Sequence, residues 1–376
     1  MNKKPSLSFY TNIPTPYQLS FFDELNERFS LTVIYYSDTE AGREWKFDLA
    51  KQYKIILLKD NYIARQIQKK VFDFHFSWQI FKVAFTDKSD YVIVGGSYWI
   101  PDAVVALIFN KLKFKKIAYF SEPLFEVKSK IKYFVKWMFL RLVSINCKAV
   151  FCVGKKASES FESFGIHLPK FIIPYNINSK SFSEIDEKRR IEFKNKYKSN
   201  NEIVILSSGS LIERKGMDIL IKAVKQIDDS NIRLIIIGDG PLRNDLTEMC
   251  NGDERIVFAG FQNPEVIPFF FSIADVFAFA SRYDGWAVVI NEAVAANVPI
   301  VCSDKVGAAL ELITSPDLGL ICKSGDVDGF KQALQLLAKN EVLRAHMKEK
   351  AKELIPLISS DYNAGYVYDI FVNELK

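Results

Sequence analysis

The chain has 376 residues, 49% hydrophobic and 25% charged, so it is long enough for two domains and too apolar for extended disorder. Its formal net charge of +5 is unevenly placed: residues 1–180 hold 27 Lys and Arg against 16 Asp and Glu, whereas residues 181–376 hold 23 against 29. The basic first half favours an anionic partner, and because no recognition-helix, zinc-finger or RNP-type motif is present, we do not expect that partner to be a nucleic acid.

Cysteine usage and the N-terminus indicate the compartment. The five cysteines lie among apolar neighbours without a Cys-x-x-Cys pair, which predicts reduced core residues. Residues 1–5 lack the apolar core of a signal peptide, and no uncharged apolar run approaches the roughly 18 residues needed to cross a bilayer. We therefore expect a protein that is cytoplasmic or peripheral on the inner face of the membrane.

Short β-branched or aromatic runs alternate with longer amphipathic runs, which is typical of parallel sheets with crossover helices. The strands predicted in the first half are Leu7–Tyr10, Leu31–Tyr36, Tyr91–Val94, Ile117–Phe120, Val150–Val153 and Phe171–Ile173. Those predicted in the second half are Ile203–Ser207, Leu234–Ile237, Ile256–Phe258, Val276–Ala278, Ile300–Cys302 and Leu320–Cys322. The sequence thus predicts an α/β protein with two Rossmann-like doubly wound domains facing across a cleft.

The domain boundaries follow from composition. A stretch rich in Lys, Glu, Ser and Asn separates the halves, and we predict an N-terminal domain at residues 1–178, a linker at 179–200 and a C-terminal domain at 201–360. Residues 361–376 are aromatic and amphipathic, so we expect a C-terminal helix that packs back on either domain, with the N-terminal domain as the first candidate.

Two features of the first half bear on function. Glu122 comes just after a predicted strand, where it would be an acid of the cleft; the alternative is a solvated loop Glu. Further along, one predicted helix carries an apolar stripe, formed by Ile131, Phe134, Val135, Met138, Phe139, Leu142 and Val143. Its remaining surface holds Lys130, Lys132, Lys136, Trp137 and Arg141.

For this helix we favour a stripe buried against a sheet, with a solvated basic side. The alternative is a helix that presses Trp137 and its lysines on anionic lipid. Either arrangement favours an acceptor that is membrane-borne, polyanionic or a lipid diphosphate.

In the second half, Gly209 and Ser210 follow the first strand, and Arg214 and Lys215 precede a helix. Glycine lets the backbone approach a ligand, and a forked Arg beside a Lys suits a diphosphate. A solvated basic pair is the alternative.

A glycine-rich turn with Gly238 and Gly240 follows the next strand. It lacks the full G-x-G-x-x-G spacing and an acid about twenty residues later, so an ordinary dinucleotide site is disfavoured and a purely structural turn is favoured. Phe261 comes after the strand beyond it, next to a glycine, where the backbone would reach a base.

Two acids, Asp284 and Glu292, flank a turn made of Gly285, Trp286 and Ala287, and an Ala-rich helix begins between them. Both acids can face one ligand, whose phosphates would lie on the helix N-terminus. For an isolated pair, the alternative is a loop Asp that caps the helix and a solvated Glu. Another helix start, at 307–311, follows the next strand.

Taken in this order, these elements resemble the C-terminal half of retaining glycosyltransferases of family 4, the group 1 glycosyl transferases with the glycosyltransferase B fold. The resemblance covers about residues 200–350. It implies that Lys215, helped by Arg214, binds the donor diphosphate, that Glu292 holds ribose hydroxyls and that Asp284 holds hydroxyls of the donor sugar. The backbone of Trp286 and Ala287 would meet phosphate, and the rest of the donor pocket would comprise Gly209, Ser210, Gly238, Gly240, Phe261 and Gly285.

The chain departs from the family pattern at two of these positions. Asp284 stands where the family has a Glu, which keeps the charge but shortens its reach, and Ser210 stands where the family often has an Arg. The first departure bears on sugar selectivity, and the second makes phosphate binding depend more on Arg214 and Lys215.

The resemblance implies a retaining hexosyltransferase that uses a nucleoside-diphosphate sugar and a glycan or glycolipid acceptor, in cell-surface polysaccharide synthesis. Its catalytic residues would be Lys215, Arg214, Asp284 and Glu122, and no metal or other cofactor is required. We interpret Asp326 in the DxD-like 326–328 as a helix cap rather than a metal ligand, and the three histidines have no metal or relay spacing. The alternatives are a sugar-nucleotide epimerase on the same fold and a catalytically silent sugar-nucleotide-binding subunit.

Overall fold

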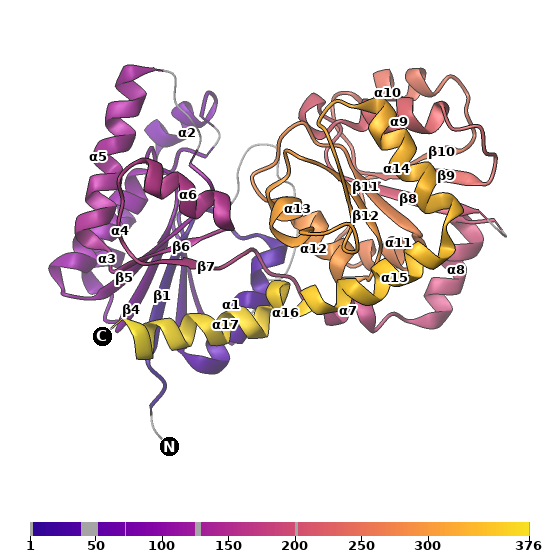
Figure 1. The fold of residues 1–376 in the computed structure, drawn as a ribbon. Coiled ribbons are helices and arrows are strands. Elements are labelled where there is room, and N and C mark those ends of the chain that lie inside the picture. Colours follow the sequence, from indigo (N-terminus) through magenta and orange to yellow (C-terminus); the bar gives the residue numbers. More distant parts are fainter. Residues whose placement is uncertain (1–2, 39–51, 72, 125–128, 200–201, 376) are drawn as a thin grey trace. The chain divides into compact units, whose positions relative to one another are not determined.

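The computed structural model describes residues 3–38, 52–71, 73–124, 129–199 and 202–375, and they divide into two compact units. The first unit is Met1–Asn176 with Ser360–Lys376, and the second is Ile177–Ser359. Each unit holds one parallel sheet with helices on both faces (Figure 1).

The sheet of the first unit has the strand order β3-β2-β1-β4-β5-β6-β7. Its strands are β1 (Ser6–Thr11), β2 (Ser30–Tyr35), β3 (Lys54–Leu57), β4 (Tyr91–Gly95), β5 (Lys116–Ser121), β6 (Ala149–Cys152) and β7 (Lys170–Ile172). Its helices are α1 (Pro16–Arg28), α2 (Tyr62–Gln68), α3 (Gln79–Thr86), α4 (Pro101–Leu112), α5 (Lys130–Asn146), α6 (Lys155–Ser163), α17 (Ser360–Asp369) and the π-helical η3 (Ile370–Glu374).

Two apolar layers cover this sheet because successive strand side chains point to opposite faces. Phe9 packs in the layer with α1, α17 and η3, while the next residue, Tyr10, packs in the layer with α3, α4, α5 and α6. The C-terminal segment is therefore part of the first unit's core, where Phe371 lies against Tyr91 and Phe151.

The sheet of the second unit has the order β10-β9-β8-β11-β12-β13. Its strands are β8 (Ile203–Ser208), β9 (Ile232–Ile237), β10 (Ile256–Gly260), β11 (Val276–Phe279), β12 (Ile300–Ser303) and β13 (Leu320–Cys322). Its helices are α7 (Lys180–Ser183), α8 (Glu187–Tyr197), η1 (Glu213–Lys215), α9 (Met217–Lys225), α10 (Arg243–Cys250), α11 (Ile267–Ile273), α12 (Val288–Ala295), α13 (Gly307–Leu312), α14 (Val327–Lys339), α15 (Glu341–Ala351), η2 (Lys352–Leu354) and α16 (Ile355–Ile358).

Every predicted strand overlaps an observed one, and the predicted α/β class is confirmed. One strand, β3, was missed. It pairs with β2 alone among the described strands, and its four residues are only partly buried or exposed, so it lacks the fully apolar pattern of the central strands.

Two other expectations need correction. The predicted linker at 179–200 contains α7 and α8, which pack on α11 of the second unit, with Phe193 stacked on Phe269. The apolar stripe of α5 is only partly buried: Phe139 and Val143 lie in the core, whereas Ile131, Phe134 and Met138 are exposed.

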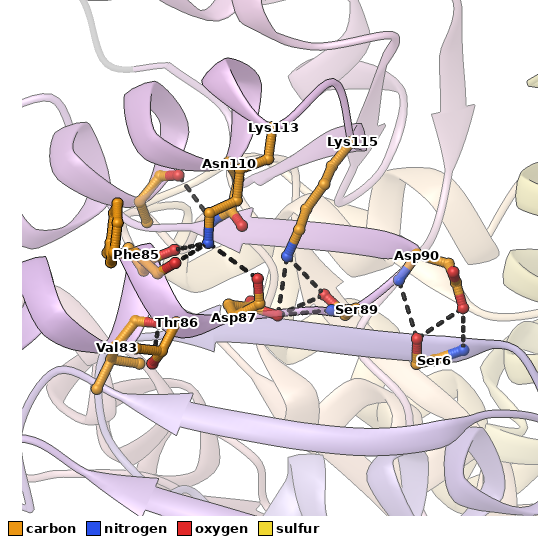
Figure 2. A network of polar contacts seen from close by, with 12 residues as sticks. Ser6, Val83, Phe85, Thr86, Asp87, Ser89, Asp90, Asn110, Lys113 and Lys115 are labelled. Carbon is orange, nitrogen blue, oxygen red and sulfur yellow. Dashed lines mark hydrogen bonds and ion pairs between the residues drawn. The ribbon is translucent and has the colours of Figure 1, made fainter.

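A polar network links the end of α3 to β1 and to the segment between α4 and β5 (Figure 2). The buried side chain of Asp87 accepts hydrogen bonds from the Tyr10 hydroxyl at 2.7 Å and from Ser89, and it pairs with Lys115 Nζ at 2.8 Å. Burial alone would raise the pKa of Asp87, but these hydrogen bonds and the Lys115 charge lower it below its usual value. Lys113 Nζ donates to the carbonyls of Ala84, Phe85 and Asp87, which closes the end of α3.

Candidate donor site

The carboxyl ends of β8 and β11 lie side by side at the point where the strand order of the second sheet reverses, which is where ligands of such sheets bind. Between β8 and α9 the chain bends at Gly216, whose φ is +67°. A Cβ at this position would lie 2.1 Å from the Ala280 carbonyl oxygen, so only glycine fits. The bend places Arg214 and Lys215 beside the loop that leaves β11.

The structure brings three predicted site residues together. Lys215 Nζ lies 2.6 Å from Asp284 Oδ2, and Arg214 Nη1 lies 3.3 Å from the same oxygen. Lys215 and Asp284 are 16% and 14% exposed, whereas Arg214 is 47% exposed. The two cations expected to bind a diphosphate are thus held by the acid expected to bind a sugar.

Sequence reasoning missed a second ion pair that fixes this arrangement. Arg282 donates to both carboxylate oxygens of Asp218 at 2.8 Å and to the Glu213 carbonyl at 2.7 Å. The Arg282 backbone N–H and the Ser281 hydroxyl both donate to the Arg214 carbonyl. Arg282 and Asp218 are 64 positions apart in the sequence, so no local pattern predicts that they pair.

The glycine-rich turn after β9 packs backbone against backbone. A Cβ at Gly238 would lie 2.0 Å from the Gly209 carbonyl oxygen, and one at Gly240 would lie 2.7 Å from the Leu211 carbonyl oxygen. Leu211 also donates its N–H to the Asp239 carbonyl at 2.9 Å. These contacts account for both glycines of the turn without a ligand. Ser210 and Phe261 are exposed, Phe261 by 58%.

The loop from Asp284 to α12 is held by the segment before α13. Asp284 donates its N–H to Lys305 and accepts from the N–H of Gly307, each at 3.0 Å. A Cβ at Gly307 would lie 2.0 Å from the Gly285 carbonyl oxygen. The N–H and the carbonyl of Asp284 are therefore both hydrogen-bonded, which fixes the backbone that carries its carboxylate.

The residues between the two acids turn inward. Trp286 is buried, its ring N–H donates to Asn291 Oδ1 at 3.2 Å, and its carbonyl accepts from Ala308. Ala287 caps α12 with φ at +70°, a left-handed conformation that is unusual for a residue other than glycine. Such strain persists where surrounding contacts impose it, and it is concentrated at functional sites.

Glu292 lies just over one turn into α12 and is partly buried. Desolvation by burial raises the pKa of its carboxyl to about 8. Among the residues that the structure describes, none forms a hydrogen bond or an ion pair with this carboxyl. Its charged form is costly without a partner, which is the condition expected of a group that awaits a ligand.

Glu122, the remaining predicted site residue, belongs to the first unit. It follows β5 and accepts a hydrogen bond from the Tyr175 hydroxyl at 2.6 Å. The Tyr175 ring contacts those of Tyr17 and Phe120. Glu122 is exposed, so an accessible carboxylate lies beside an aromatic group at the carboxyl edge of this sheet.

Asp326, His75 and His346, considered above as metal ligands, make contacts within the protein. The predicted capping role of Asp326 is confirmed, since its Oδ1 accepts the Gly329 N–H at 2.9 Å at the start of α14. His75 is buried with Nδ1 3.1 Å from Asp60, and His346 pairs with Asp317 on the surface. Within the described ranges, no group of three or more His, Cys, Asp or Glu could hold a metal ion.

Comparison with known proteins shows what the chain is similar to. Residues 188–354 match the model of the family "Glycosyl transferases group 1". The chain is 30% identical over 152 residues to the N-acetylgalactosamine-N,N'-diacetylbacillosaminyl-diphospho-undecaprenol 4-alpha-N-acetylgalactosaminyltransferase of Campylobacter jejuni, covering 39% of this chain and 40% of that protein. It is also 30% identical over 155 residues to the lipopolysaccharide core biosynthesis glycosyltransferase LpsE of Rhizobium meliloti, covering 40% and 44%. The chain thus spans less than half the length of these two curated relatives.

Solved structures agree over the whole chain. Anabaena HepE in complex with UDP superposes with a TM-score of 0.78 at 16% identity, covering 97% of this chain and 98% of that one. A glycosyltransferase of Rickettsia africae superposes with a TM-score of 0.76 at 14% identity and full coverage of both chains. At these identities the likeness shows the fold, and the predicted glycosyltransferase B fold is confirmed.

Proposed function

We propose that this chain, whose residues 188–354 match the model of the glycosyl transferases group 1 family, moves a sugar from a nucleoside diphosphate to a hydroxyl of a glycan or lipid-linked glycan. The observation that carries the proposal is the carboxyl of Glu292, which is desolvated and has no partner among the described residues. A vicinal pair of ribose hydroxyls supplies the two hydrogen bonds that would stabilise its charged form.

In this scheme the donor diphosphate takes over the cations that Asp284 now holds. Lys215 and Arg214 would turn toward the diphosphate oxygens, because a dianion offers them more charge than one carboxylate. The freed carboxylate of Asp284 would then accept hydrogen bonds from the donor sugar. Gly209, Ser210 and the backbone N–H groups at the start of α12 would complete the phosphate site.

Catalysis would consist of positioning and electrostatic stabilisation. As the glycosidic bond to the diphosphate breaks, negative charge grows on the leaving oxygen, and Lys215 and Arg214 would stabilise it while the acceptor hydroxyl attacks the anomeric carbon. The proton of that hydroxyl leaves with the diphosphate product. Retention of anomeric configuration is part of the proposal and follows from the family resemblance.

The first unit would bind the acceptor, with Glu122 and the rings of Tyr17 and Tyr175 facing its sugar. The Campylobacter relative is named for transfer to a diphospho-undecaprenol carrier, which supports a lipid-linked acceptor for this chain as well. A cytoplasmic protein that works at the inner face of the membrane fits such an acceptor. No helix in the described part of the chain is long and apolar enough to span a bilayer.

The nucleotide of the donor is identified first, by calorimetric binding of UDP, GDP, ADP and their sugars. The same ligands should raise the unfolding midpoint of the protein, because a ligand that binds only the folded state stabilises it. UDP is the starting probe because HepE was solved with it. We expect Glu292→Gln and Lys215→Ala each to lower transfer at least 100-fold, in line with the loss of a charge-stabilising contact. The exposed positions of Glu248→Gln and Lys339→Ala make them matched controls.

The same assay separates the competing functions. An epimerase would convert the nucleotide sugar without an acceptor. A catalytically silent subunit would bind the nucleotide but show no turnover. The function of the assembly that contains it would be unchanged by Glu292→Gln. Near-normal transfer by both site variants would contradict the proposal.

A further inference from the structure

Helix α5 packs through one edge of its predicted apolar stripe and through residues beside that stripe. Its buried residues are Lys136, Phe139, Leu140, Val143 and Asn146. The Lys136 ammonium lies 4.7 Å from the centroid of the Phe164 ring, and burial lowers its pKa to about 8. Because the aliphatic stem of a lysine can fill apolar space, this side is buried although its sequence looks basic.

The rest of the stripe, Ile131, Phe134, Val135 and Met138, is left exposed, as is Ile145 beyond it. Ile131 is 77% exposed, Phe134 56%, Met138 53% and Ile145 70%. The Phe134 ring stacks on Trp137, and the Arg141 guanidinium lies 5.3 Å from the Trp137 ring centroid. The outward side is thus an aromatic and aliphatic strip with cations along one edge.

Helices α3 and α4 extend this apolar surface. They cover the same face of the sheet as α5, and α4 contacts both of the others (Figure 1). Trp78, just before α3, and Phe85 of α3 are each 67% exposed, and Phe81 reaches Phe109 of α4 with ring centroids 5.8 Å apart. The polar network around Asp87 in Figure 2 holds the end of α3 in place, so these rings are presented by a fixed scaffold.

Charge identifies the partner. Apart from the buried Lys136, the three helices carry Lys and Arg at five positions, Lys82, Lys111, Lys130, Lys132 and Arg141. Their single carboxylate is Asp102, which is buried. A surface that binds an ordinary protein can carry exposed carboxylates as well as cations. An anionic lipid surface repels carboxylates and attracts cations, so it accounts for helices that expose cations and no acids.

We propose that the outer face of α3, α4 and α5 docks on a bilayer that contains anionic lipid, with Ile131, Phe134 and Met138 entering the acyl boundary. Trp137 would lie at the headgroup level, where an indole has both an apolar and a polar environment, and Lys130, Lys132 and Arg141 would meet lipid phosphates. The inference develops the peripheral location proposed above and rests on that part of the proposed function alone.

The test is flotation of the full chain with large unilamellar vesicles of phosphatidylcholine, alone or with one third phosphatidylglycerol. We expect binding to the anionic vesicles, at least tenfold weaker binding to the neutral ones, and release as salt is raised to 0.5 M. The double variant Ile131→Glu/Phe134→Glu should lower binding to anionic vesicles at least tenfold. The matched control, Leu336→Glu/Val342→Glu, introduces the same charges at exposed apolar positions of α14 and α15 and should stay within twofold of the unsubstituted chain.

Folding and nucleotide binding are followed in each variant by circular dichroism and by the UDP-induced shift of the unfolding midpoint. If the glutamate variant does not fold, Ile131→Ser/Phe134→Ser gives the same comparison without new charge. Equal binding to both vesicle types, absence of binding, or binding unchanged by either variant would overturn the inference. Self-association that the variant abolishes, without vesicle binding, would identify a second copy as the partner. Vesicle binding without a UDP response would leave this inference standing and count against the donor site.

Discussion

Asp284 and Glu292 are both carboxylates of the candidate donor site, but they differ in their surroundings. Asp284 is neutralised by Lys215 and Arg214, whereas Glu292 is desolvated with no described partner. A donor would therefore change the two acids in opposite ways, releasing the first from its cations and satisfying the second. The shorter side chain of Asp284, which replaces the Glu of the family pattern, already reaches Lys215 at 2.6 Å.

The pKa of Glu292 predicts a pH-dependent stability. Its folded-state pKa is raised to about 8 from the usual 4.5, so the folded state holds a proton that the unfolded state loses as pH rises between these values. The group therefore destabilises the fold by up to about 1.4 kcal/mol per pH unit across that window. We expect Glu292→Gln to raise the ligand-free unfolding midpoint relative to the unsubstituted chain more at pH 8 than at pH 5.

Thermal unfolding at the two pH values checks this prediction, with the exposed Glu248→Gln as the control. A difference between variant and unsubstituted chain that does not change with pH would mean that Glu292 is not desolvated in solution.

At the scale of elements, glycines bring the loops of the donor site together. The loop before α12 and the start of α13 meet where Gly307 faces the Gly285 carbonyl, and the loops after β8 and β9 meet where Gly238 faces that of Gly209. These positions look like phosphate-binding turns in the sequence, and the structure shows that each also serves backbone packing.

We expect Gly307→Ala to destabilise the protein by about 1–3 kcal/mol, because the new methyl group would lie 2.0 Å from a backbone oxygen that must move. The shift of Gly285 should also reduce the UDP-induced rise of the unfolding midpoint. Gly365→Ala is the control, since this helical glycine has room for a methyl group and alanine favours helix. Unchanged stability in Gly307→Ala would show that the two loops are not tightly packed.

Helix α5 shows what the spacing of apolar residues can and cannot predict about an element. Its apolar spacing identifies an amphipathic helix, and the helix is present at Lys130–Asn146. The spacing does not say which side is buried, because Lys136 lies inside while Ile131 lies outside. That choice depends on the shape of the sheet and of α6 beneath the helix.

At the scale of the whole molecule, the first unit is completed by the end of the chain. Phe371 is fully buried and packs on Phe29, Tyr91 and Phe151. We expect Phe371→Ala to destabilise this unit by about 3–5 kcal/mol, the usual cost of removing a buried aromatic ring.

Hydrogen exchange measures this effect strand by strand. Protection should fall in β1, β4 and β6 of the first unit, while UDP-induced protection near Lys215 in the second unit should persist. Val342→Ala, at an exposed position of α15, is the control. Equal loss of protection in both units would show that they unfold as one.

Strand periodicity and glycine-bounded turns are local properties of the chain, so the α/β class, nearly all the strands and the donor-site candidates could be predicted from the residues alone. The pairing of side chains could not be predicted in this way, because it depends on the folded arrangement. Asp284 pairs with Lys215, Arg282 pairs with Asp218, the 360–376 segment joins the first unit, and part of the apolar stripe of α5 is left exposed. These outcomes depend on contacts between distant residues, whose gain in burial and charge pairing is fixed only when the sheets assemble.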